Sequence, residues 1–136
     1  MSTNVFELAP PPSEPRQREL WLQHVAGFIF FEDARKYAFT RIDPALDDTA
    51  KEAARRAVDD ALYGLMMIID GVTGGLSNSD QSVHLKFVAC LTRRLDGRDE
   101  LVAQLDLRDG DGMCMGYHGW REGDFGARPV ATRPDK

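Results

Sequence analysis

The chain has 136 residues, of which 43% are apolar and 29% charged, and its formal net charge is −5. This length suits a single domain with one core, and no membrane helix is expected because the longest apolar stretch, residues 62–69, falls far short of the roughly 20 residues required. Nucleic acid is excluded as an expected partner, because no cluster of Lys and Arg supplies the positive field that phosphates require.

The two ends of the chain are expected to lie outside the folded domain. Residues 1–14 are interpreted as a flexible lead, since the consecutive prolines at 10–12 favour extended backbone and cannot continue a helix. Residues 127–136 carry Pro129 and Pro134 and few apolar side chains, which is typical of a loose tail. The remaining residues, 15–126, are expected to form one domain.

A first helix is predicted from near Ser13, with Ser13 as the cap and Pro15 in the first turn, to about Phe39. Its apolar face begins with Trp21, Val25, Phe28 and Ile29. Gly27 precedes a run of four apolar residues at 28–31 that has no polar face. That run is compatible with a kink, a break or a short buried strand.

A second helix is predicted from Asp43-Pro44, a cap followed by a proline in the first helical position. Apolar residues then recur at helical spacing: Ala54, Val58, Ala61, Leu65 and Ile69. The polar face disappears over residues 65–69, so the last turns are expected to be buried on nearly all sides. Gly71 supplies the left-handed residue that ends a helix.

Residues 70–78 contain three glycines directly after this helix. One interpretation is a loop that cradles a ligand with its backbone. Phosphate-binding loops, however, precede a helix and use its N-terminus, and the P-loop ending Gly-Lys-Ser/Thr is absent. A plain capped turn is therefore the expectation here.

The apolar period then changes from helical spacing to strict alternation, which is typical of half-buried strands. Two such segments occur, at residues 83–92 and 101–108, and Asp96-Gly97 between them is a turn signal for an antiparallel hairpin. A third strand is expected at residues 113–118, since two strands alone are marginally stable. The predicted fold is α+β, with two N-terminal helices packed on a small antiparallel sheet in two layers.

Residues 109–126 hold six of the twelve glycines of the chain, together with Trp, Tyr, Phe, His and Cys side chains. Calcium is not expected, because Met113 occupies a position where the calcium loop needs an oxygen ligand. Zinc is not expected either, because Cys114 and His118 supply only two of the three or four protein ligands that a zinc site needs. On a strand they would lie about 13 Å apart, too far for a nucleophile and its base. We therefore assign no metal, no cofactor and no catalytic residue.

The same segment suits contact with a partner, because Trp and Tyr are common interface anchors. The candidate binding residues are Tyr117, His118, Trp120, Arg121 and Asp124. The predicted function is a non-enzymatic domain that binds a protein or peptide. Self-association as a homodimer, through the first helix or a free sheet edge, is one version.

Two other functions stay open from the sequence. A small peptide-directed hydrolase or modifying enzyme would need His118, Cys114 and an acid, Asp111 or Asp124, to converge in one pocket. A toxin-neutralising protein would present acidic surface such as Asp59-Asp60 to a basic target.

Two phrases of the chain carry a resemblance: LYGLMMIIDG at residues 62–71 and DGMCMGYHGW at residues 111–120. Over roughly residues 25–126 the chain resembles small bacterial proteins labelled as related to biosynthesis of the lantibiotic epilancin. The resemblance implies a bacterial origin and an accessory or protective role near a peptide antibiotic or toxin, and no catalytic residue. A cytoplasmic location is expected, since no signal peptide pattern occurs and Cys90 and Cys114 suit a reducing compartment.

Overall fold

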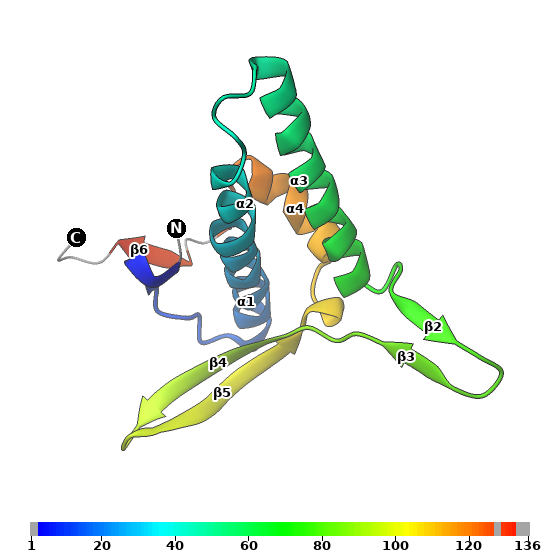
Figure 1. The fold of residues 1–136 in the computed structure, drawn as a ribbon. Coiled ribbons are helices and arrows are strands. Elements are labelled where there is room, and N and C mark those ends of the chain that lie inside the picture. The colour runs from blue at the N-terminus through cyan, green and yellow to red at the C-terminus, as the bar shows by residue number, and fades with distance from the viewer. Residues whose placement is uncertain (1–2, 127–128, 133–136) are drawn as a thin grey trace.

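The computed structural model describes residues 3–126 and 129–132. The chain is α+β, as predicted: its helices form one body, and its strands form short antiparallel pairs, two of which extend away from that body (Figure 1). Two details of the prediction are wrong. One helix follows the strands, and the described strands form three separate two-stranded sheets rather than one layer.

The first helical segment runs without a break through α1 (Pro15–Ile29), a π-helix (Phe30–Arg35) and α2 (Lys36–Thr40), close to the predicted end at Phe39. Gly27 therefore does not interrupt it. The cap is Glu14 instead of the predicted Ser13, because the Glu14 carboxylate accepts hydrogen bonds from the backbone N–H groups of two first-turn residues. The π turn re-phases the helix, so that Phe31 is buried while Ile29 stays exposed.

The second long helix, α3 (Asp48–Ile69), begins later than predicted. Asp47 caps it by accepting from Ala50 N at 2.8 Å, while Asp43 closes a separate turn by accepting from Ala45 N. The helix ends as predicted, with Gly71 at φ +77°.

The last turns of α3 are not buried on nearly all sides. Met66 and Ile69 are buried, but Leu65, Met67 and Ile68 keep part of their surface. The strands that follow run away from the helix and do not pass back across it (Figure 1).

The predicted hairpin is confirmed as β4 (Val88–Leu95) paired with β5 (Arg98–Asp106). Asp96 and Gly97 between them both have positive φ, 53° and 76°, which matches the twist of a two-residue hairpin turn. The inner end of this hairpin reaches the core, where Leu91 and Leu105 are buried.

The alternating segment 83–92 is divided between two sheets. Its first part belongs to β3 (Ser82–His84), which pairs with β2 (Gly75–Ser77), and its second part to β4. The glycine-rich segment 70–78 is thus more than a capped turn, because it leads into β2.

The expected third strand at residues 113–118 is instead part of α4 (Met113–Arg121). The carboxylate of Asp70 accepts hydrogen bonds from the backbone N–H of Met113 at 2.7 Å and of Cys114 at 2.9 Å, so a residue 43 positions away caps this helix. Met113, Tyr117 and Trp120, at helical spacing, form the buried face. Local alternation could not reveal a cap supplied from so far along the chain.

The two end segments contribute one strand each to a further pair. β1 (Phe6–Leu8) lies antiparallel to β6 (Val130–Thr132). The first strand comes from the expected lead and the second from the expected tail. Residues 127–128 and 133–136 of that tail lie outside the described residues.

Trp120 lies at the centre of the core, 1% exposed, between α1 and its own helix. A side chain at Gly27 or at Gly116 would occupy the space of the Trp120 ring. The indole Nε1–H donates to His24 Nδ1 at 3.0 Å, so the polar atom of this buried ring is satisfied. Among the described residues, none of the helices has the length and apolar content of a membrane span.

Replacing the two helical glycines separately tests this packing. Gly27→Ala should lower the free energy of unfolding by about 1–3 kcal/mol, because the new methyl group overlaps a ring with no room to move. Gly64→Ala on α3 is the matched control, since no neighbouring atom lies within 4 Å of the added methyl. It should raise stability by about 0.5–1 kcal/mol through helix propensity alone. Urea unfolding measures both, and equal effects would contradict this description of the core.

Candidate functional site

The five predicted binding residues do not share one surface. Tyr117 and Trp120 are 2% and 1% exposed and belong to the core, so neither offers a ring to a partner. His118 and Arg121, three residues apart on α4, are exposed, and Asp124 follows the helix, where its carboxylate accepts from Gly126 N.

Tyr117 is held by a buried polar network that joins three helical segments. Its hydroxyl donates to the Asp59 carboxylate at 2.7 Å, and Arg35 donates to both oxygens of that carboxylate, from Nε at 2.7 Å and from Nη2 at 3.2 Å. Burial, and then the bond to Asp59, raise the pKa of Tyr117 above its ordinary value. Burial would also raise the pKa of Asp59, but the bonds from Arg35 and Tyr117 outweigh it and leave that pKa lowered.

This network also bears on the toxin-neutralising hypothesis. Asp59 is buried and paired with Arg35, so of the two aspartates only Asp60 presents a carboxylate at the surface. The acidic pair therefore does not form the surface that a basic target would need.

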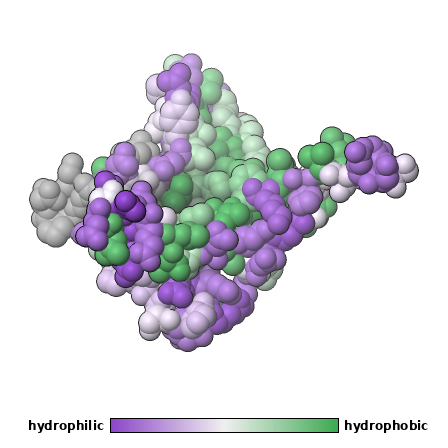
Figure 2. Space-filling model, turned by 90° about the horizontal axis from the view of Figure 1, so that it is seen from below, coloured by the Kyte–Doolittle hydropathy of each residue, from purple (hydrophilic) through white to green (hydrophobic). Residues whose placement is uncertain are grey.

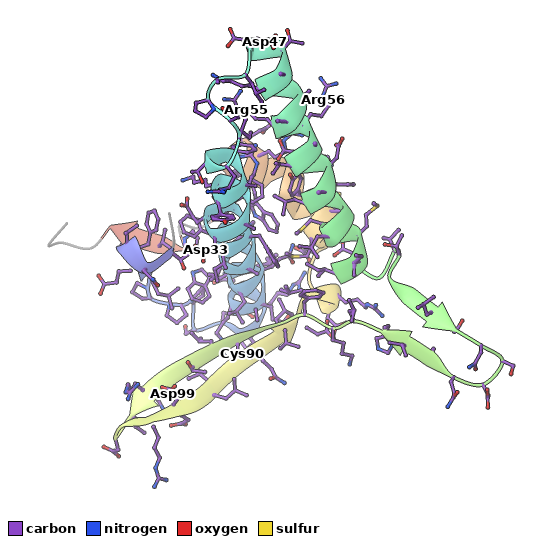
Figure 3. All side chains as sticks on the ribbon, viewed as in Figure 1. Asp33, Asp47, Arg55, Arg56, Cys90 and Asp99 are labelled. Carbon is purple, nitrogen blue, oxygen red and sulfur yellow. The ribbon has the colours of Figure 1, made fainter. Side chains whose placement is uncertain are left out.

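Arg121 lines an open recess of about 440 Å³ between α2, α3 and α4. Its lining carries four arginines and three acids, and two of the arginines, Arg55 and Arg56, come from α3 (Figure 3). Arg35 is already paired with Asp59, and Arg121 lies 3.9 Å from the same carboxylate. Because the arginines and acids of the recess partly neutralise one another, its charge favours neither an anionic nor a cationic ligand.

Cys114 and His118 lie one turn apart on α4, so the strand-based separation of about 13 Å does not apply. Their surroundings are nevertheless unsuited to nucleophilic catalysis. Burial, followed by the neighbouring Asp70, raises the pKa of the Cys114 thiol and disfavours the reactive thiolate. The His118 ring packs against the Tyr63 ring at a tilt of 49°, with ring centroids 5.6 Å apart.

The acids named for a hydrolase point elsewhere. Asp111 pairs with Arg16 of α1, and Asp124 is engaged by its own turn. The acid beside Cys114 is Asp70, whose two oxygens are occupied by the cap of α4. Within the described part of the chain, no group of three or more His, Cys, Asp or Glu side chains could hold a metal ion.

An exposed apolar surface lies instead on the segment that we call the arm, residues 75–84, which comprises β2, its turn and β3. The arm projects from the end of α3 (Figure 1). In Figure 2 hydrophobic residues lie between its hydrophilic tip and the rest of the molecule. Leu76 is 80% exposed and Val83 is 68% exposed, although the two residues are directly opposed across the hairpin. Among the described elements, β2 and β3 make substantial contact only with each other.

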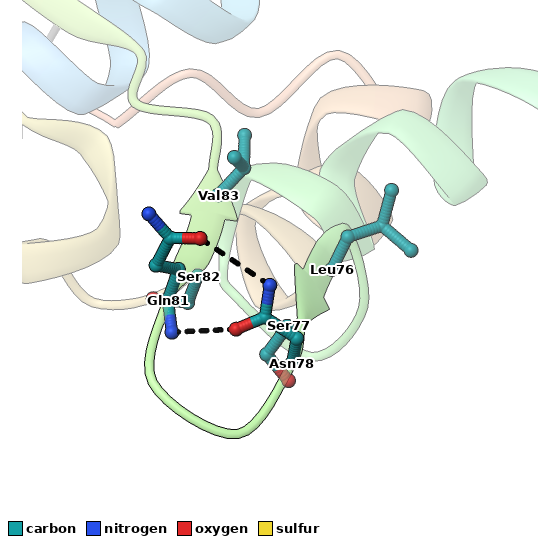
Figure 4. Close-up of a pocket in the computed structure, with 6 residues that line it drawn as sticks. All are labelled: Leu76, Ser77, Asn78, Gln81, Ser82 and Val83. Atoms are coloured by element: carbon teal, nitrogen blue, oxygen red, sulfur yellow. Dashed lines mark hydrogen bonds between the residues drawn. The ribbon is translucent and has the colours of Figure 1, made fainter.

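The arm has one apolar and one polar face. Opposed residues of an antiparallel pair lie on the same face, so Leu76 and Val83 form a continuous apolar surface. Ser77 and its partner Ser82 occupy the opposite face. The turn is closed by Asn78, whose side-chain oxygen accepts from the Gln81 backbone at 2.8 Å (Figure 4). The residues of the arm line an open recess of about 630 Å³.

The second projecting hairpin, β4–β5, differs from the arm in its protection against partners. Its strands carry ion pairs between opposed side chains, Arg93 with Glu100 and Arg94 with Asp99. Asp99 lies near the tip of this hairpin (Figure 3). A register irregularity at Leu91/Thr92 interrupts the pairing. Charges and irregularities of this kind discourage edge pairing. The strands of the arm contain neither Lys, Pro nor a register shift.

Sequence reasoning missed Leu76 and Val83. A signal was available, because residues 72–85 contain a single formally charged side chain, Asp80, in a chain that is 29% charged. The alternation that begins at Val83 was assigned to one long strand, which concealed the separate hairpin.

No family model, curated protein or solved structure matches the chain.

The Asp59 network yields a stability prediction with a neighbouring control. Asp59→Ala should lower the free energy of unfolding by about 3 kcal/mol, because it leaves the half-buried Arg35 and the buried Tyr117 hydroxyl without their partner. Asp60→Ala, on the exposed side of the same turn, should change it by less than about 0.5 kcal/mol. Chemical unfolding measures both variants, and an equally small effect at Asp59 would contradict the assigned role of the network.

Proposed function

We propose that the chain is a non-enzymatic protein-binding domain and that the apolar face of the arm is its contact surface. The observation that carries this proposal is the exposure of the opposed pair Leu76 and Val83 on a hairpin that no described helix covers. An isolated two-stranded hairpin is marginally stable in water, and it becomes stable when its apolar face is covered. A partner that covers the arm would therefore stabilise the hairpin and bury its apolar surface together.

The composition of the arm favours a protein or peptide over a small charged ligand. Its exposed side chains are Leu, Val, Ser, Asn, Gln and His, with Asp80 as its one formally charged residue. Apolar contact surrounded by hydroxyl and amide groups is typical of protein interfaces, whose centres are depleted in charge. The strands of the arm are three residues long, and their outer edges add a few backbone groups that a partner strand could pair with.

The setting of this binding is also a proposal. Cys90 and Cys114 are unpaired thiols, which favours a reducing compartment and hence the cytoplasm. The resemblance to epilancin-related proteins favours a bacterial accessory role near an antibiotic or toxin system.

A photocrosslinking experiment tests the proposed function. With p-benzoylphenylalanine in place of Leu76, irradiation of cells that express the chain should give an adduct between this chain and a second polypeptide. The same amino acid in place of Tyr37 is the matched control, because Tyr37 is an aromatic residue, 57% exposed, on α2. An adduct at position 76 and none at position 37 would support the arm as the contact surface. Absence of an adduct at 76, or equal yields at both positions, would overturn the proposal.

A further inference from the structure

We propose that the arm and the loop at its base form a binding site for a phosphate group, with Arg108 as the residue that pairs with its charge. The site is an open recess of about 600 Å³ at the point where the arm leaves the end of α3 (Figure 1). It is lined by the loop 71–75, by both strands of the arm and by Arg108, which belongs to the short 3-10 helix Leu107–Asp109.

The recess takes its hydrogen-bond donors from the polar face of the arm, so it does not depend on the proposed protein contact. Alternation along the two strands places three polar residues on the face opposite Leu76 and Val83: Ser77, Ser82 and His84. All three line the recess, as does Thr73 of the loop. In the part of the chain that the structure describes, none of these four side chains makes a hydrogen bond. Their hydroxyl and imidazole groups are donors of the kind that phosphate oxygens accept from.

The guanidinium of Arg108 supplies positive charge at the base of the recess. It lies over Gly71, where a Cβ would be only 2.7 Å from the guanidinium carbon Cζ. Among the described residues it has no carboxylate partner. The neighbouring Asp106 accepts from the Arg108 backbone N–H and lies 3.8 Å from Lys86 Nζ. A planar guanidinium can donate two parallel hydrogen bonds to one phosphate, so an unpaired arginine beside neutral donors suits this group.

The charge of the recess contrasts with that of the chain. Twenty-two of the 136 residues are acidic, yet no Asp or Glu of the described ranges lines this recess. Asp70, which precedes the loop, directs both carboxylate oxygens to the first backbone N–H groups of α4. The recess that Arg121 lines differs, because three acids accompany its arginines. An anion that enters the recess of the arm therefore meets a cation and donors without an opposing carboxylate.

The size of the recess bears on what carries the phosphate. Sites for small molecules have volumes of about 300–1,000 Å³, and this recess falls within that range. Val72, which is 68% exposed, adds an apolar side chain to the lining. The recess thus has room for an organic group attached to the phosphate, and free phosphate and a phosphate monoester share the same recognition chemistry.

Titration of the isotope-labelled full chain with inorganic phosphate tests the inference by nuclear magnetic resonance, with chloride keeping the ionic strength constant. The backbone amide signals of residues 71–77 and 82–84 should shift and saturate, while those of residues 93–100 at the tip of β4–β5 should not. Arg108→Gln should weaken binding by at least about tenfold, the effect of losing hydrogen bonds to a charged group. Arg98→Gln, which removes the same charge from the exposed tip of β4–β5, is the matched control and should bind like the wild type.

A second variant tests the contribution of the arm. His84→Ala should weaken phosphate binding by about two- to tenfold, the effect of losing one neutral hydrogen bond. All three variants replace exposed side chains, so each should keep the wild-type helix content in circular dichroism. Titration with phenyl phosphate distinguishes the two sources of the group. Tighter binding than inorganic phosphate supports a site for a phosphate monoester, and equal binding supports a site for free phosphate.

Four results would overturn the inference. The first is the absence of saturable shifts, and the second is an equal loss of affinity in Arg108→Gln and Arg98→Gln. The third is an unchanged affinity in His84→Ala, since the arm would then take no part. The fourth is acetate binding as tight as phosphate binding. If Arg108→Gln lowers only the stability to urea, Arg108 instead offsets the partial negative charge at the end of α3, and the phosphate site is overturned as well.

Discussion

The position of α4 depends on the contact between Trp120 and the two glycines, Gly27 and Gly116, that leave room for its ring. The indole fills the space beside α1, and its N–H is satisfied by His24, so the ring lies in the core without an unpaired polar atom. The carboxylate of Asp70 caps the same helix at its other end. These contacts join α1, the end of α3 and α4 into one body. Every helix in that body buries its apolar face against another helix or against the inner end of β4–β5.

The closure of this body explains why the arm remains outside it. Asp70 and Gly71 end α3, and the chain leaves the body at the point where α4 is capped. Neither Leu76 nor Val83 belongs to the core, which the helices and the inner end of β4–β5 form among themselves. A protein that exposes an apolar face in this way gains stability when another protein covers that face. The interpretation as a binding domain follows from this division between a complete body and an uncovered arm.

The elements that were predicted correctly from the sequence are those that depend on neighbouring residues. The helical spacing of α3, its stop at Gly71, and the Asp96-Gly97 turn are all determined within a few residues, and the structure confirms them. The α4 helix was assigned as a strand because its cap comes from Asp70, far along the chain, and because glycines at 112, 116 and 119 weaken the local helix signal. The burial of Tyr117 and Trp120 could not be predicted either, because an aromatic-rich sequence is typical both of a core and of an interface.

The candidate site shows the same limit. The sequence predicted contact residues among the aromatic rings of residues 109–126, but Tyr117 and Trp120 are buried. The exposed residues Leu76 and Val83 lie in segments interpreted as a turn and the start of a strand. Exposure depends on what the rest of the chain covers, and no local pattern encodes that. The low charge of residues 72–85 was the single local feature that distinguished the arm.

The central claim is that the arm is covered by protein when the chain is in its working state. Hydrogen–deuterium exchange of the backbone amides of residues 75–84 measures this coverage directly. The account predicts that these amides exchange more slowly when the chain is isolated together with the protein that crosslinks at position 76 than when the chain is alone, while the amides of α3 are unaffected. Equally rapid exchange of the arm in both samples would contradict it.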